Sequence, residues 1–157
     1  MAIEKVREYF KKFGIENRIR EFDVSSATVE LAAAALGCQP CRIAKTLSFA
    51  IEDGAVLVVC AGDAKVSNPK FKAAFQTKAK MLPFDDVELL VGHAVGGVCP
   101  FAVNDGVRIY LDKSLERFDT VFPACGSSNS AIELTIDELE KYSSPLSWVD
   151  VCQIPEP

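Results

Sequence analysis

The first forty residues show apolar positions at helical spacing, separated by short polar stretches. Residues 2–13 place an apolar side chain at every third or fourth position and are followed by Gly14, a helix stop signal; these apolar residues are Ile3, Val6, Phe10 and Phe13. A short strand is expected over residues 19–22. The next helix spans residues 30–36, with Ser26 or Thr28 as N-cap and Gly37 as C-cap.

The middle of the chain changes to the pattern of β-strands. Two apolar runs, residues 43–51 and 55–61, are joined at Glu52-Asp53-Gly54 and predict a β-hairpin. Further strands are expected over residues 78–82, 107–111, 117–122 and 131–134, with an edge strand over 148–151.

Helices interrupt these strands at irregular intervals. Asn68-Pro69 opens a helix that turns Phe71, Ala74 and Phe75 inward, and Pro83 to Asp86 opens another that ends near Gly92. A helical turn is expected over 112–115, and Thr135 to Glu138 form a capping box before a final helix. This order predicts an α+β fold with a mixed or mostly antiparallel sheet, in one domain over residues 1–157.

The composition is that of an ordinary globular protein. Hydrophobic residues make up 49% of the 157 residues and charged residues 25%. The longest apolar runs are far shorter than the roughly 20 residues that span a bilayer. The first seven residues mix charges and contain no apolar signal core. We therefore expect a cytoplasmic protein with no membrane partner.

Charge is unevenly distributed along the chain. The net charge of −5 disfavours non-specific nucleic-acid binding, and no DNA partner is expected. Residues 1–83 carry 13 Lys or Arg against 9 Asp or Glu, whereas residues 84–157 carry 4 against 13. A basic stretch within residues 63–80 has five lysines against one acidic residue, Asp63, and could contact a phosphate backbone; these lysines are Lys65, Lys70, Lys72, Lys78 and Lys80. On charge alone, a solvated surface explains these lysines equally well.

Six cysteines, without a secretory signal, are expected to be reduced thiols. Cys38 and Cys41 form one C-x-x-C pair, but tetrahedral zinc needs four ligands and the chain has one histidine, His93. A thioredoxin-like pair would open a helix after a strand, whereas this pair follows a predicted helix. Two thiols in a helix-to-strand turn are the favoured interpretation, and we expect no metal and no organic cofactor.

Two segments carry the candidate chemistry. In the segment Gly96-Gly97-Val98-Cys99-Pro100, the two glycines allow backbone angles closed to other residues, and Pro100 fixes φ where the loop ends. Such a loop can bring backbone amides close to a ligand. Lys45 is a cation within an apolar strand and could hold a phosphate or a carbonyl oxygen. The alternatives are a sterically required tight turn and a surface-facing strand lysine.

Two further features have both a functional and a structural interpretation. Cys99 lies six residues after His93 and could form a Cys–His nucleophile, although a small packed loop residue is the favoured interpretation. The polar turn of residues 127–130 could contact ligand hydroxyls or cap itself.

Several motifs, in order, resemble the YbaK family, the editing-domain superfamily of aminoacyl-tRNA deacylases associated with prolyl-tRNA synthetase. The resemblance covers about residues 15–140. It rests on Ala-Leu-Gly before Arg42-Ile43-Ala44-Lys45-Thr46-Leu47, then Gly62-Asp63, Gly92 with Gly96-Gly97-Val98-Cys99-Pro100-Phe101, Leu111-Asp112 and Cys125-Gly126.

This resemblance implies a mixed, barrel-like sheet flanked by helices and hydrolysis of the ester of a misacylated tRNA. The expected substrates are Cys-tRNA(Pro) and Ala-tRNA(Pro), and prolyl-tRNA synthetase is a candidate partner. With such a substrate, the basic stretch becomes the expected tRNA-facing surface, through Lys65, Lys70, Lys72 and Lys78. A non-catalytic tRNA- or synthetase-binding module of the same fold is the alternative. Lys45 is the expected catalytic residue, and the expected substrate-binding residues are Thr46, Gly96, Gly97, Val98, Cys99, Pro100, Cys125, Gly126 and Ser127. Some relatives have a serine where this chain has Ala124, so any role of that serine is lost here.

Overall fold

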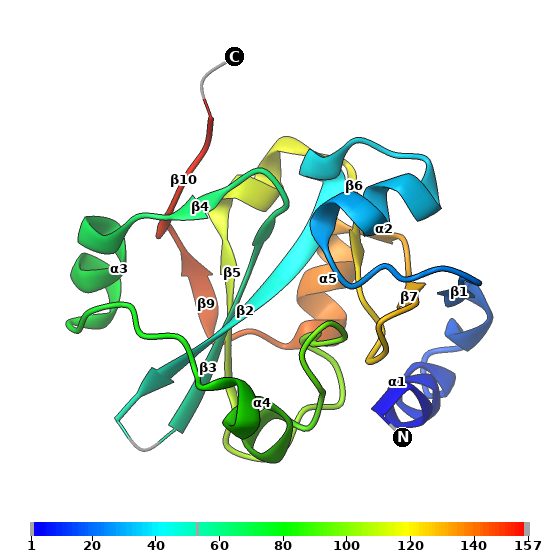
Figure 1. Ribbon diagram of the computed structural model, residues 1–157, viewed down its shortest axis with the longest axis horizontal. Helices are drawn as coiled ribbons and strands as arrows, with labels where there is room; N and C mark the ends of the chain where they lie inside the picture. Colours follow the sequence, from blue (N-terminus) through cyan, green and yellow to red (C-terminus); the bar gives the residue numbers. More distant parts are fainter. Residues whose placement is uncertain (1, 53, 156–157) are drawn as a thin grey trace.

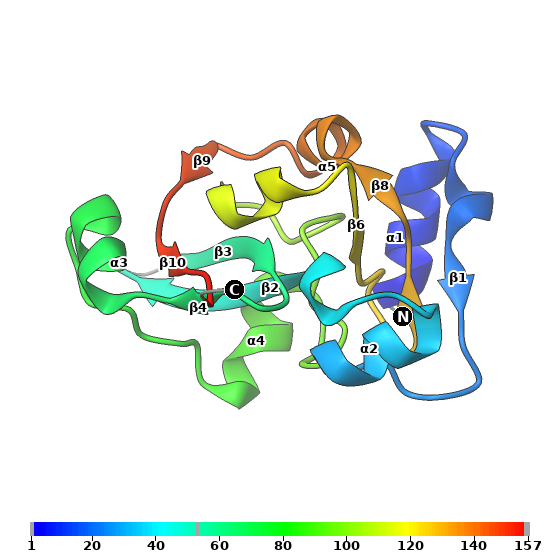
Figure 2. The ribbon, with the colours of Figure 1, turned by 90° about the horizontal axis from the view of Figure 1, so that it is seen from above.

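A six-stranded mixed sheet forms the centre of the protein. The computed structural model describes residues 2–52 and 54–155. The strand order is β8-β6-β2-β3-β5-β9 (Figures 1 and 2). The bounds are β2 Ile43–Ile51, β3 Gly54–Ala61, β5 Arg108–Asp112, β6 Thr120–Pro123, β8 Leu134–Thr135 and β9 Ser147–Val149.

The strand pairing confirms the mixed sheet. β2 and β3 form the expected antiparallel hairpin, in register from Ala44 opposite Ala61 to Ile51 opposite Gly54, while Asp53 of its turn lies outside the described residues. β6 pairs with β8 antiparallel, whereas β2–β6, β3–β5 and β5–β9 are parallel. Two antiparallel ribbons complete the strands, pairing β1 (Arg20–Glu21) with β7 (Ser130–Ala131) and β4 (Lys65–Val66) with β10 (Cys152–Gln153).

Helices cover the sheet on both sides. Figures 1 and 2 show α2 and α4 on one side and α5 on the other, with α1 and α3 at opposite ends. Their bounds are α1 Ala2–Lys11, α2 Val29–Leu36, α3 Asn68–Phe75, α4 Phe84–Val91 and α5 Ile136–Ser143. None of these helices, nor any other within the described ranges, is long and apolar enough to cross a bilayer.

The predicted helix caps are confirmed because they depend on local chemistry. The Thr28 hydroxyl accepts the Leu31 N–H before α2, and Gly37 ends that helix with φ of 72°. Thr135 and Glu138 form the expected capping box of α5.

Several details differ from the sequence prediction. Residues 78–82 are not a strand but make a single bridge, Met81 opposite Phe49. The strand expected over residues 117–122 begins at Thr120, because a 3₁₀ turn occupies Lys113–Arg117. The strand expected over residues 131–134 is divided between β7 and β8, which pair with different partners. Ala74 is exposed, because the buried side of α3 is formed by Phe71 with Phe75 four residues later.

Candidate active site

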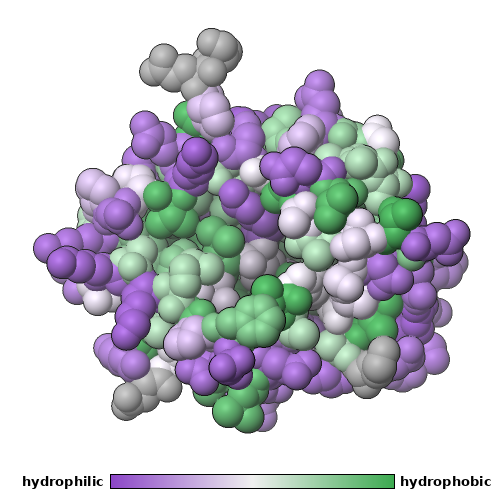
Figure 3. All heavy atoms as spheres, in the orientation of Figure 1, coloured by the Kyte–Doolittle hydropathy of each residue, from purple (hydrophilic) through white to green (hydrophobic). Residues whose placement is uncertain are grey.

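A cavity of about 370 Å³ opens beside the middle of β2, between the start of α2 and α4. Figure 3 shows mainly apolar and weakly polar surface at the centre of this face, with hydrophilic side chains around it. The lining comes from four parts of the chain: the segment entering α2 (Ser26–Val29 and Ala32), β2 (Ile43–Ser48), the α4 region (Met81, Leu82, Phe84, Val87, Val95, Gly96 and Val98), and the segment after β6 with its neighbours (Phe122, Ala124, Ser130 and Ala131). No Asp, Glu or His is among these residues.

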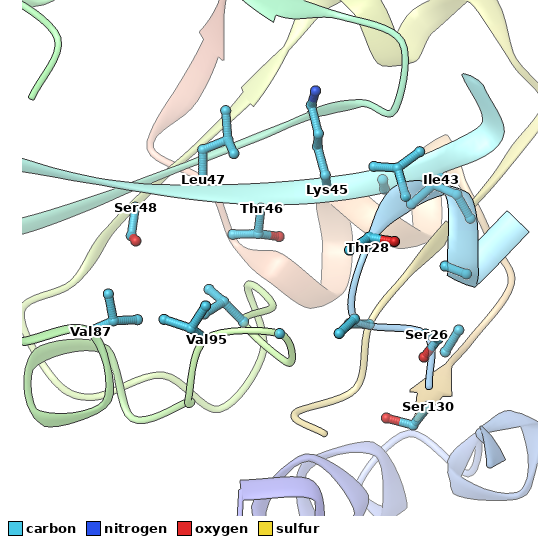
Figure 4. A pocket seen from close by; sticks show the side chains of 18 of the residues that line it. Ser26, Thr28, Ile43, Lys45, Thr46, Leu47, Ser48, Val87, Val95 and Ser130 are labelled. Atoms are coloured by element: carbon cyan, nitrogen blue, oxygen red, sulfur yellow. The ribbon is translucent and has the colours of Figure 1, made fainter. Parts of the chain in front are cut away.

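Lys45 lines this cavity with its stem and directs its ammonium to the loop after β3. Its Nζ donates to the Ala64 carbonyl at 2.5 Å and to the Gly62 carbonyl at 3.4 Å. An ammonium has three donors, so one N–H is left without a partner among the described residues. In Figure 4 the side chain leaves β2 on the side opposite Thr46.

The loop that receives Lys45 is fixed by a two-point ion pair. Asp63 accepts two hydrogen bonds from the Arg117 guanidinium, at 2.6 and 3.1 Å. These bonds lower the pKa of Asp63. The Ala61 N–H also donates to the Ser114 hydroxyl at 3.0 Å, which ties the end of β3 to the same 3₁₀ turn. The acceptors of the Lys45 ammonium are therefore held in place.

The glycine-rich loop contributes alternate residues to the cavity. Gly96 and Val98 line it, whereas Gly97, Cys99 and Pro100 are buried behind its wall. A Cβ on Gly97 would lie 2.7 Å from the Ser127 nitrogen and 2.8 Å from the Gly126 carbonyl carbon. Glycine at position 97 therefore allows the loop to pack directly on the backbone of the turn after β6.

His93 and Cys99 come together, but not as a nucleophile pair. The Cys99 sulfur lies 3.5 Å from His93 Nε2, and both residues are fully buried. Burial lowers the pKa of His93 and raises the pKa of Cys99 to about 12, so the thiol stays protonated near neutral pH. His93 Nε2 lies 2.7 Å from the Phe101 carbonyl, which joins the two ends of the glycine-rich loop. The favoured interpretation of Cys99 as a packed loop residue agrees with this geometry.

The turn after β6 reaches the cavity through Ala124 and Ser130. Cys125 is buried, and Gly126 and Ser127 are partly buried outside the lining. The Ser127 hydroxyl donates to the Ser130 hydroxyl at 2.6 Å, so Ser127 contacts a lining residue without lining the cavity itself. The Ser128 carbonyl accepts the Ser26 N–H, which connects this turn to the segment before α2.

The four predicted tRNA-contacting lysines lie away from the cavity. Lys65 is in β4, Lys70 and Lys72 are on α3, and Lys78 follows that helix; all four are exposed. Lys70 Nζ already lies 3.1 Å from an Asp150 carboxylate oxygen and donates to the Cys152 carbonyl. Its charge is therefore partly compensated within the chain.

Sequence reasoning missed two walls of the cavity. Ser26 and Thr28 line it, although the sequence marks them only as candidate helix caps, and so do Phe84 and Val87, which the sequence places in a short helix. No local signal marks them as lining residues, because their role depends on α2 and α4 meeting at β2.

The C-x-x-C pair lies in the expected helix-to-strand turn, with Cys38 after α2 and Cys41 in the 3₁₀ turn Pro40–Arg42. Across the described ranges, no group of three or more His, Cys, Asp or Glu residues is arranged to hold a metal ion.

Comparison with known proteins identifies the class. The family described as "Aminoacyl-tRNA editing domain" matches residues 23–142. The chain therefore belongs to the aminoacyl-tRNA editing domain family, which confirms the resemblance drawn from its motifs.

Individual relatives extend this match over nearly the whole chain. A Bacillus subtilis (strain 168) protein, "Uncharacterized protein YwhH", is 51% identical over 154 residues and covers 98% of both chains. A crystal structure described as "a putative trans-editing enzyme for prolyl tRNA synthetase" superposes with a TM-score of 0.86 at 25% identity, covering 97% of both chains. The structure of "hypothetical protein APE2540" gives 0.83 at 28% identity, covering 95% of this chain and 99% of that one. These structures share the mixed fold flanked by helices that the resemblance implied.

Proposed function

We propose that residues 1–157 form one trans-editing deacylase domain that hydrolyses the ester of misacylated tRNA, with Cys-tRNA(Pro) and Ala-tRNA(Pro) as substrates. The observation that carries the proposal is the small apolar cavity bordered by Lys45, Gly96 and Val98 in a member of the editing-domain family. The structure described as "a putative trans-editing enzyme for prolyl tRNA synthetase" supports action on tRNA(Pro), with the synthetase as a partner.

The size of the cavity suits a second hydrolytic site. A synthetase separates amino acids that differ by about one methylene by only about 1–3 kcal/mol, so a separate site must remove the wrong ones. Val87, Val95 and Val98 give this cavity apolar walls that fit a small side chain.

Lys45 supplies the charge for catalysis in this proposal. Its remaining N–H donor would hold the terminal nucleotide or stabilise the negative charge that develops on the ester. Since the lining contains no carboxylate or imidazole, hydrolysis depends on positioning a water or on the substrate's own hydroxyl. The basic residues Lys65, Lys70, Lys72 and Lys78 would contact the tRNA backbone.

The test is release of labelled amino acid from Cys-tRNA(Pro) and Ala-tRNA(Pro) by the wild type, Lys45→Ala and Lys113→Ala. Lys113 is an exposed lysine outside the cavity lining and serves as the matched control. We expect Lys45→Ala to lose about a hundredfold or more in rate, and Lys113→Ala to match the wild type. A folded wild type that binds these tRNAs without hydrolysis would replace the deacylase by a binding module.

A further inference from the structure

The outer edge of β2 has a gap in its hydrogen bonding at Thr46. On one side of the gap, β6 pairs with Ile43 and Ala44. On the other side, the Leu82 N–H donates to the Ser48 carbonyl at 3.0 Å, and the Ala50 N–H donates to the Lys80 carbonyl at 2.8 Å. Backbone groups of alternate residues point to the same edge of a strand, so the Thr46 N–H and C=O point outward into this gap.

The gap arises because both neighbouring segments turn away. Continuing the antiparallel register of the Phe49–Met81 bridge would place Phe84 opposite Thr46, but Phe84 is the first residue of α4. On the other side, the parallel pairing ends at Pro123, and Ala124 forms no further pair with β2. The opening is therefore about one residue wide.

The cavity lies against this edge. Ile43 to Ser48 line it as an unbroken run, although successive side chains of a strand point to opposite faces. Figure 4 shows this directly, with Lys45 and Leu47 on one side of β2 and Thr46 and Ser48 on the other. Such a run can border one cavity only if the edge of the strand faces it.

Thr46 also has an unsatisfied side chain. Its hydroxyl oxygen is buried, and no described residue hydrogen-bonds it. The Thr46 N–H and C=O also take part in none of the described pairings along this edge of β2, so three polar groups of Thr46 are left for a ligand at the cavity. A buried hydroxyl is normally paired, so its lack of a partner beside two outward-pointing backbone groups indicates that a ligand supplies the partners.

We infer that the free edge at Thr46 binds the aminoacyl group in the manner of an added β-strand residue; the inference rests on the proposed function and specifies how that site holds its substrate. In an antiparallel hydrogen-bonded pair, two residues exchange both N–H···O=C bonds. An aminoacyl ester carries the same two groups on either side of its Cα. Its α-amino group donates to the Thr46 C=O, and its ester carbonyl accepts the Thr46 N–H.

This arrangement separates recognition of the amino acid backbone from selection of its side chain. Side chains of directly paired residues lie next to each other on one face. The ligand side chain on the Thr46 face would then meet Val87 and Val95, toward which Thr46 points in Figure 4. Every amino acid offers the same backbone groups, so these walls select by size.

The first test uses two non-hydrolysable adenosine probes, a 3′-alanylamide and the 3′-propionylamide that lacks the α-amino group. We expect the alanyl probe to bind about tenfold or more tightly, as for a charge-assisted hydrogen bond, and to shift the Thr46 amide signal in ¹⁵N NMR. Equal affinities, or binding without a shift at Thr46, would overturn the inference.

The second test uses variants at Thr46. Thr46→Pro removes the N–H at an edge position where proline is tolerated, and Thr46→Val keeps the N–H but removes the hydroxyl. We expect Thr46→Val to retain the preference for the alanyl probe and Thr46→Pro to lose it. A folded Thr46→Pro that keeps the preference would refute the inference. If Thr46→Pro does not fold, the probe comparison on the wild type decides alone.

The two proposals fail in distinguishable ways. Normal deacylation with no involvement of the Thr46 amide overturns the edge inference and leaves the deacylase standing. Probe binding at Thr46 without hydrolysis of any aminoacyl-tRNA tested overturns the deacylase and leaves the edge inference standing.

Discussion

Gly97→Ala should damage the site through backbone contact, without removing any functional side chain. The new Cβ would lie 2.7 to 2.8 Å from backbone atoms of Gly126 and Ser127. The loop and the turn must separate by about 0.7 Å before the contact becomes an ordinary one. Neither partner is a flexible side chain that could rotate away, so Gly96 and Val98 must shift at the cavity wall.

Two quantities follow from this displacement. Overpacking of this kind costs about 1–3 kcal/mol in the free energy of unfolding. A shift of nearly 1 Å in a positioning element can lower kcat by up to about a hundredfold. The assay is Ala-tRNA(Pro) deacylation at saturating substrate, together with urea unfolding of the same preparation.

Gly54→Ala is the matched control for this substitution. A Cβ at Gly54 meets its nearest atoms at 3.7 and 3.9 Å, and Gly54 does not line the cavity. We expect it to keep wild-type kcat and stability. If Gly97→Ala behaved like Gly54→Ala in both measurements, the argument that direct packing of the loop on the turn shapes the cavity would be wrong.

Three further predictions concern pH and charge. Burial lowers the pKa of His93 below its ordinary 6.5, so on acidification the unfolded chain takes up the proton before the folded protein does. The free energy of unfolding of the wild type should therefore fall as the pH drops below about 6.5. This part of the loss should be absent in His93→Gln, as measured by urea unfolding at stepped pH. Hydrogen bonds from Arg18 lower the pKa of Glu138 to about 2, so Glu138→Gln should lower the free energy of unfolding by up to about 1 kcal/mol at pH 7. Calorimetry should show this difference between the two proteins disappearing as the pH falls from about 4.5 through 2. Replacing Lys72 and Lys78 together by alanine should weaken tRNA binding and reduce the slope of log K against log salt by about 1 to 2, and an unchanged slope would remove the basic stretch from the interface.

The sequence predicted the elements whose signals are local. Thr28, Gly37 and the Thr135 capping box set helix ends through their own backbone contacts, and the two longest apolar runs gave the β2–β3 hairpin. The break between β7 and β8 could not be predicted, because it depends on which distant strands pair with each half.

The candidate site was predictable only in part, for the same reason. Lys45, Thr46, Gly96 and Val98 were named from their motifs and line the cavity. The cavity wall formed by α2 and α4 could not be predicted, because it exists only once the two helices meet at β2 in the folded protein. Cys99 and Pro100 belong to the same motif as Gly96 and Val98, but the course of the loop buries them behind the wall.

The distribution of the six thiols makes the native protein a ready substrate for site-directed labelling. Cys60, Cys99, Cys125 and Cys152 are buried, whereas Cys38 and Cys41 are partly accessible in the turn that leads into β2. A maleimide fluorophore on the native sequence should therefore attach in this turn. Ile43, two residues after Cys41, lines the cavity, so we expect ligand binding to change the fluorescence of a dye in this turn without any engineered cysteine.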